Sequence, residues 1–143
     1  MGEPQTIAKV TTRAQKDMAL ALKLVADVQE KHESGKRDGT KGRYQSLCQE
    51  FAVMVRTMGL CQTLAFCESK KGSGGGLPEA HDILLNHVKK ILGFQIQDDL
   101  PRDGLLQRIQ DASASEYMHH TRRVLEAWVY FKRFAKSVLT VED

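Results

Sequence analysis

The residues of this chain best suited to chemistry are the cations of its last helical segment, roughly Ser113 to Leu139. At about 100° per residue, an apolar stripe occupies one side of this segment and most of the cations lie opposite or beside it. Guanidinium and ammonium groups arranged in this way suit a polyanion such as a nucleic-acid backbone. The stripe contains Tyr117, Val124, Trp128, Phe131, Ala135 and Val138, and the candidate nucleic-acid-binding cations are Arg122, Arg123, Lys132, Arg133 and Lys136.

Four further cations are candidates for contact with an anionic backbone. Arg13 and Lys16 belong to a first amphipathic helix, predicted over Thr6 to Lys31. Lys41 and Arg43 lie in or beside a polar, glycine-rich loop. For all of these cations, including those of the last helix, the alternative is a solvated surface that only keeps the protein soluble.

Arg56 differs from the other cations because it interrupts an otherwise apolar helical region, Arg43 to Lys70. A buried Arg must be paired, so we expect Arg56 to bond carbonyls or a carboxylate near Gly59. Gly59 itself predicts either a break between two helices or a close approach of two helices.

Other chemistry finds little support in the sequence. The pairs Cys61 with Cys67 and His81 with His87 are each six residues apart, which is not a zinc-ligand spacing. No arrangement of acids, bases or nucleophiles indicates a catalytic centre, so neither an enzyme nor a metal site is expected. The glycines at 72–76 lack the Gly-Lys-Ser/Thr ending of a phosphate loop and predict a linker. Trp128 could stack on a base, but its place in the apolar stripe favours core packing.

Composition sets the class of protein. The 143 residues fit one domain, 1–143, and 41% hydrophobic with 27% charged residues is a normal globular balance. The net charge of +3 is too mild to argue for nucleic-acid binding without local clustering. Three cysteines among apolar neighbours predict small core residues in a reducing cytoplasm. Apolar runs are too short for a bilayer, so no membrane association is expected.

The hydrophobic periodicity predicts an all-α protein, a compact bundle of five or six helices. The region from Arg43 to Lys70 is apolar around much of its circumference, including Val53 and Phe66, and is expected to be the buried centre of the fold. Ser113 and Glu116 have the spacing of a capping box that opens the last helix. The expected helices cover 6–31, 43–70 in one or two pieces, 78–92, 101–111 and 113–139.

Two stretches resemble the small α-helical subunit of the type III-B (Cmr) CRISPR effector complex. They are YQSLCQEFAVMVRTMGLCQTLAF, from Tyr44, and EYMHHTRRVLEAWVYFKRFAKSVL, from Glu116. One departure is the pair Phe51-Ala52, where that family often has Leu-Pro, so the helix here is expected to run on without a kink. The matching residues are Tyr44, Ser46, Leu47, Arg56, Thr57, Gly59, Leu60 and Gln62 in the first stretch, and Glu116, Tyr117, Met118, Thr121, Arg122, Lys132, Arg133, Phe134 and Ala135 in the second.

The resemblance implies a non-catalytic subunit of an RNA-guided antiviral complex, with no cofactor. It implies that copies of the chain associate with one another as a filament, beside other subunits of the effector complex and the duplex of guide RNA and target RNA. The basic face of the last helix would then support RNA binding. The alternative from the residues alone is a helical protein-binding adaptor with no nucleic-acid role.

Overall fold

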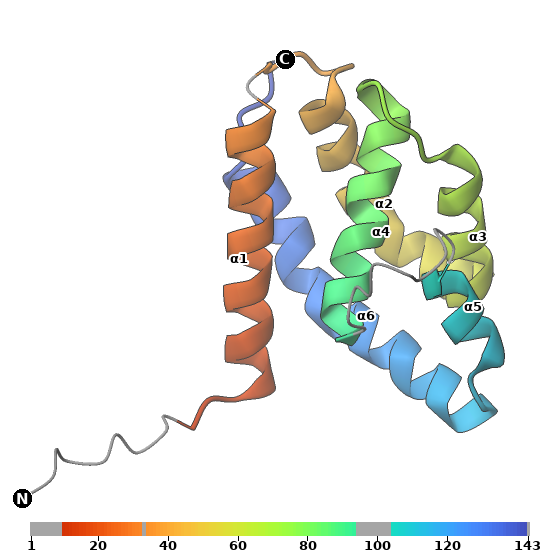
Figure 1. Ribbon diagram of the computed structural model, residues 1–143. Coiled ribbons are helices and arrows are strands. Elements are labelled where there is room, and N and C mark those ends of the chain that lie inside the picture. Colours follow the sequence, from red (N-terminus) through yellow and green to blue (C-terminus); the bar gives the residue numbers. More distant parts are fainter. Residues whose placement is uncertain (1–9, 33, 94–103, 143) are drawn as a thin grey trace, which may run out of the picture.

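The computed structural model describes residues 10–32, 34–93 and 104–142, and within these ranges it contains six α-helices and no strand. The predicted all-α bundle of five or six helices is confirmed (Figure 1). The helices are α1 (Arg13–Lys31), α2 (Thr40–Met58), α3 (Leu60–Lys70), α4 (Gly76–Leu92), α5 (Gly104–Asp111) and α6 (Ala114–Ser137).

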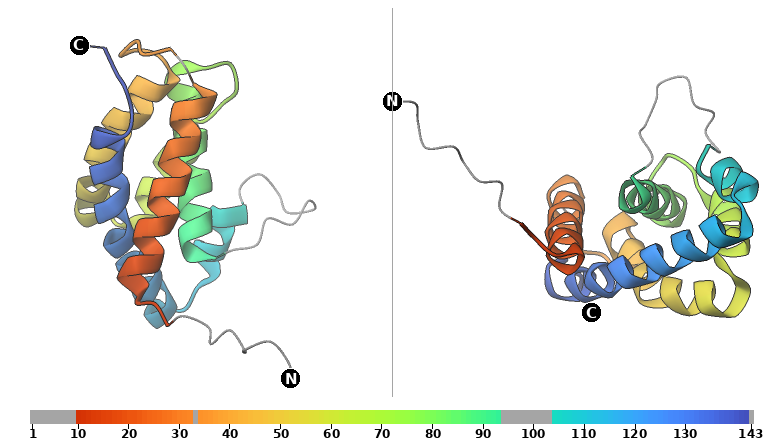
Figure 2. Two further views of the ribbon diagram at one scale, coloured as in Figure 1. Left: turned by 90° about the vertical axis from the view of Figure 1, so that its left-hand side faces the viewer. Right: turned by 90° about the horizontal axis from the view of Figure 1, so that it is seen from below.

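Helices α2 and α4 form the centre of the packing, because α2 contacts α3, α4 and α6, and α4 contacts α1, α2, α3 and α6. Helix α1 lies along α6 and also touches α4, whereas α5 packs against α3. Figures 1 and 2 show α1 at one side of the bundle and α3 at the opposite side, with α6 passing behind α4 between them. None of the described helices is both long and apolar enough to span a membrane.

An aromatic cluster on α2 and α6 forms the middle of the core. The ring of Trp128 stacks on Phe131 with centroids 4.8 Å apart, and it lies 4.6 Å from Phe51. The indole Nε1 donates a 3.0 Å hydrogen bond to the backbone carbonyl of Cys48. All four residues are almost fully buried, so the indole has its polar atom satisfied inside the core. The prediction that Trp128 packs in the core is confirmed.

Helix α1 begins later than its periodicity predicted. Thr12 is the N-cap and forms a capping box with Gln15, so the helix starts at Arg13. Val10 is 93% exposed, and the predicted helix is therefore wrong for residues 10–12. Its residues 6–9 lie outside the described part of the chain. The helix begins at the Thr12 cap, although the apolar spacing alone would have extended it further toward the N-terminus.

The break at Gly59 is confirmed. Gly59 has φ of +88°, a conformation that residues with a Cβ rarely adopt, and it separates α2 from α3. A Cβ built at this position would lie 3.3 Å from the hydroxyl of Tyr117, and that hydroxyl accepts a hydrogen bond from the backbone N–H of Cys61. The interpretation as a break between two helices therefore holds, and the neighbour at Gly59 is the tip of the Tyr117 side chain. Helix α2 runs unbroken through Phe51 and Ala52, as expected.

The region of α2 and α3 is less buried than its composition predicted. Val53 and Phe66 are 58% and 41% exposed, so the expectation that they face the core is wrong. Cys48 and Cys67 are buried, as expected, and Cys61 is half-buried. Burial raises the pKa of the Cys67 thiol to about 12. The linker predicted at the glycines is confirmed, because residues 72–75 form the loop between α3 and α4. Residues 94–103, which include the first residues of the helix predicted over 101–111, lie outside the described part of the chain.

A buried histidine makes the fold sensitive to acid. The hydroxyl of Tyr44 and Nδ1 of His87 form a 2.5 Å hydrogen bond in the core between α2 and α4. Burial lowers the pKa of His87 to about 3, with smaller contributions from Lys90 and Lys31. The imidazole is therefore neutral in the folded protein at neutral pH.

We expect the free energy of unfolding to fall as the pH drops from 7 to 5. The unfolded chain takes up a proton at His87 near its ordinary pKa of 6.5, whereas the folded chain does so only near 3. At pH 5 this difference corresponds to about 2 kcal/mol from His87 alone. Urea denaturation at each pH measures the effect. His87→Gln should flatten the dependence, the exposed control His119→Gln should not, and an equal pH dependence in both variants would contradict the assignment.

Candidate nucleic-acid interface

The orientation of α6 is set at its N-terminus and along its buried side. Ser113 and Glu116 form the predicted capping box, with reciprocal hydrogen bonds of 3.2 Å between side chain and backbone N–H. The apolar stripe packs inward as predicted, because four of its members have no exposed surface, and Tyr117 and Val138 are half-buried. The fully buried members are Val124, Trp128, Phe131 and Ala135.

Four of the five candidate cations on α6 face solvent: Arg122, Lys132, Arg133 and Lys136. The last three line a groove of about 390 Å³ between α6 and α2. Two glutamines of α2 fix the walls of this groove. Gln45 and Gln49 donate hydrogen bonds of 2.9 and 3.0 Å to the backbone carbonyls of Ala135 and Lys132.

The groove is cationic at its rim and apolar at its floor. Ala52, Leu125 and Val129 contribute apolar surface, and no Asp or Glu is among the lining residues. An apolar floor lowers the local dielectric constant, which strengthens the attraction between each cation and a bound anion. A second hollow continues along α6 past Leu125 and is lined by Met118, Arg122 and the acidic Glu126. Only the groove itself therefore has a lining of cations without an acidic residue.

Arg56 belongs to this groove, and the expectation that it is buried and paired is wrong. Its side chain is exposed, it lines the groove from α2, and the structure gives it no ion pair within the described residues. The spacing of Gln49, Ala52 and Arg56, three and then four residues, places them on one side of α2. That spacing was the signal in the sequence for a second wall. The apolar character of the surrounding segment obscured it.

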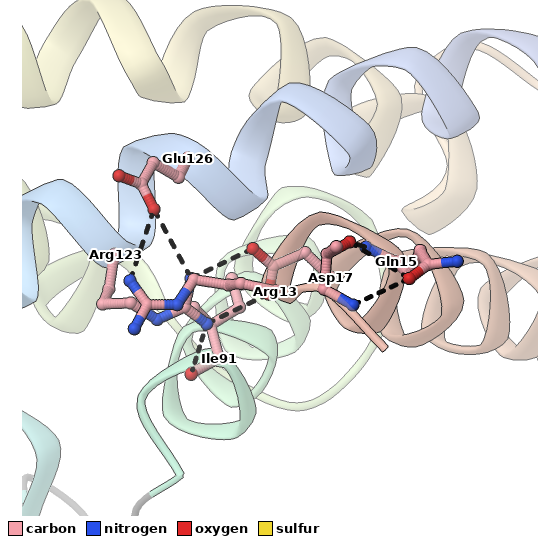
Figure 3. A network of polar contacts seen from close by, with 7 residues as sticks. Arg13, Gln15, Asp17, Ile91, Arg123 and Glu126 are labelled. Atoms are coloured by element: carbon pink, nitrogen blue, oxygen red, sulfur yellow. Dashed lines mark hydrogen bonds and ion pairs between the residues drawn. The ribbon is translucent and has the colours of Figure 1, made fainter. Parts of the chain in front are cut away.

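Arg123 is engaged inside the bundle and does not line the groove. Its Nη1 and Nη2 atoms each donate a 3.0 Å hydrogen bond to the carboxylate of Asp17, whose side chain is 6% exposed (Figure 3). Nη2 also lies 3.5 Å from the carbonyl oxygen of Ile91. The hydrogen bonds to Asp17 raise the pKa of the guanidinium above its ordinary value. This bidentate pair ties α6 to α1, so we assign Arg123 a structural role.

The remaining candidates do not join the groove. Arg13 and Lys16 are exposed on α1, and Arg13 lies 3.7 Å from the carboxylate of Glu126 on α6 (Figure 3). Lys41 is only 2% exposed at the start of α2, so its side chain offers little to a ligand. Arg43 is exposed but lines a different hollow, between α2, α3 and α4.

A purely structural explanation exists for some of the cationic groups. Lys136 lies in the last turn of α6, where a positive charge is stabilised by the negative end of the helix dipole, whereas Lys132 and Arg133 lie a turn earlier. That effect is worth about 0.3–1 kcal/mol per exposed charge at low salt. It does not account for Arg56, which approaches the same groove from another helix.

The described residues give no indication of a metal centre, since no group of three His, Cys, Asp or Glu side chains within them could hold an ion. The α2–α6 groove brings together four cations from two helices without an acidic residue in its lining, an arrangement that suits an anionic ligand.

Comparisons with known proteins point to one family. The family model described as CRISPR-associated protein (Cas_Cmr5) matches residues 13–138. A protein of Thermus thermophilus named "CRISPR system Cmr subunit Cmr5" is 35% identical over 107 residues, which make up 75% of this chain and 83% of that protein. A crystal structure of a CRISPR-associated Cmr5 family protein from the same organism matches with a TM-score of 0.70 and 30% identity, covering 92% of this chain and 100% of that one.

The structural role of Arg123 predicts an asymmetry between two acidic residues that contact it. Asp17→Asn should lower the free energy of unfolding by about 3 kcal/mol, because it removes the charge that pairs with a largely buried guanidinium. Glu126→Gln should change it by less than about 0.5 kcal/mol, because that carboxylate is 45% exposed and its contacts are long. Urea denaturation measures both variants. Equal losses in the free energy of unfolding would show that the pair of Asp17 and Arg123 stabilises the fold no more than the exposed Glu126 does.

Proposed function

The chain belongs to the CRISPR-associated Cmr5 family, and we propose that it is the non-catalytic small subunit of a type III-B (Cmr) RNA-guided effector complex acting in antiviral defence. As a single helical domain in the cytoplasm, it stacks with other copies into a filament. It lies beside the other subunits of the complex and supports the binding of guide RNA and target RNA through its basic face.

The observation that carries the RNA-binding part is the α2–α6 groove. Arg56 from α2 and Lys132, Arg133 and Lys136 from α6 converge on it without an acidic residue in the lining. Arg122 extends the same face along α6. The net charge of +3 would not attract RNA to the whole surface, so local convergence is what favours a polyanion.

The groove suits recognition of a nucleic-acid backbone by charge and shape. Arg presents a planar fork that meets phosphate oxygens two at a time, and Lys supplies a compact charge. Such contacts position a strand but carry no sequence information, which base pairing with the guide supplies. One copy makes few contacts, so retention of the duplex depends on repetition along the filament.

A second candidate is a protein-binding adaptor with no nucleic-acid role. Met118 and Val129 lie on the same face of α6 and are 64% and 47% exposed, which favours contact with a protein surface. The two functions differ in their dependence on salt, because phosphate contacts release counterions and apolar contacts do not.

Removing the cations of the groove should weaken RNA retention and flatten its dependence on salt. We expect Lys132→Ala, Arg133→Ala and Lys136→Ala together to reduce the slope of log K against log salt by about 2–3 per copy, because each neutralised phosphate contributes about 0.7–0.9 to that slope. Binding of guide–target duplex by the assembled complex, titrated with salt, provides the measurement.

The matched control removes the same number of charges elsewhere. Lys23, Lys36 and Lys90 are exposed and lie outside the groove, so their replacement by Ala should leave the slope nearly unchanged. An equal change of this slope in both triple variants would show that the effect comes from net charge and not from the groove. An unchanged slope in the groove variant would remove the groove from the RNA contact set and favour the adaptor.

A further inference from the structure

Two exposed apolar patches lie outside the cationic groove. Met18 and Leu22 on α1 are 42% and 46% exposed, and Phe66 on α3 and Leu77 on α4 are 41% and 39% exposed. Large apolar side chains exposed in pairs at a turn of helix or around a hollow mark contact surfaces more often than isolated ones do. Neither pair belongs to the lining of the α2–α6 groove.

The patch on α1 is an uncharged ridge. Gln15, Met18, Leu22 and Ala26 follow one another at intervals of three, four and four residues, so they form one stripe along the helix. The charged residues Lys16 and Lys23 lie about 100° or more away around the helix from Met18 and Leu22. A ridge of this kind seats well in an apolar depression and gains little from a charged one.

The patch around α3 is such a depression, of about 400 Å³. Leu47, Met54, Phe66 and Leu77 supply apolar surface from three helices. The ring of Phe66 is held in place, since it meets His81 edge-on at 6.0 Å and has Nζ of Lys70 5.7 Å from its centre. We call these eight lining residues the α3 hollow: Arg43, Ser46, Leu47, Glu50, Met54, Phe66, Leu77 and His81.

We propose that the α1 ridge of one copy docks in the α3 hollow of the next, and that this is the contact by which copies stack. This inference rests on the self-association in the proposed function and names its two surfaces. Figure 1 shows α1 and α3 at opposite sides of the bundle. A contact between different surfaces at opposite sides leaves one ridge and one hollow free at the ends, so it builds an open filament instead of a closed dimer.

Charge also favours a second copy as the occupant. The lining of the α3 hollow has one Arg and one Glu, Arg43 and Glu50, and Lys70 lies at its edge over the ring of Phe66, whereas the ridge has no charge. A strand of RNA would gain less from the hollow, where Glu50 opposes the cations, than from the α2–α6 groove, whose lining has four cations and no acidic residue. The stacking surfaces and the RNA-binding surface are thus separate.

Site-specific cross-linking tests this pairing in the full-length chain. The reactive positions would be Ala26→Cys on the ridge and Ser46→Cys in the hollow, because both are small residues beside the apolar anchors. Cys61→Ser removes the half-buried thiol, and Cys48 and Cys67 are buried. With a short bismaleimide, the variant carrying both new cysteines should give a ladder of oligomers. A mixture of the two single variants should stop at the dimer, and each single variant alone should give none.

Aspartate in the ridge tests the apolar contact itself. Adding Leu22→Asp to the doubly reactive chain should reduce the ladder more than about tenfold, since it puts a charge in the apolar hollow. The matched control Val53→Asp, exposed and outside both patches, should leave it intact. Absence of a ladder, or efficient cross-linking within one single variant, overturns the proposal. If the groove variants still change the salt slope in that case, the RNA-binding proposal survives.

Discussion

The burial of the aromatic ridge of α6 against α2 is the constraint on which the rest of the structure depends. Trp128 can be buried only with an acceptor for its indole N–H, and the carbonyl of Cys48 supplies one at 3.0 Å. Its stacking on Phe131 and its contact with Phe51 then fix the rotation of α6 about the helix axis. That rotation sends Lys132, Arg133 and Lys136 to solvent. The cationic surface is a consequence of packing.

The same packing decides between cations that look alike in the sequence. Arg122 and Arg123 are adjacent, yet one reaches solvent and the other meets the buried carboxylate of Asp17. A helical projection places Arg123 beside the basic face but cannot show that an acid from α1, over a hundred residues earlier, lies opposite it. For Arg56 the expectation of a buried, paired side chain is wrong for the converse reason. Its neighbours are apolar, but its own position on α2 faces the groove.

The sequence therefore predicted the parts of the fold that depend on local chemistry. The capping box at Ser113, the break at Gly59 and the inward stripe of α6 each follow from residue type and spacing within a few turns. The late start of α1 and the outward orientation of Phe66 depend on a cap and on tertiary contacts, which spacing alone does not reveal. The second wall of the groove depends on which helices become neighbours.

The central claim is that the groove between α2 and α6 is the surface that touches RNA. Photo-cross-linking within the assembled complex, with thiolated uridines in the target strand and mass spectrometry of the modified peptides, tests it most directly. We expect cross-links in peptides around Arg56 and 129–136. Cross-links confined to α1 or to residues 34–43, with the groove peptides unmodified, would contradict it.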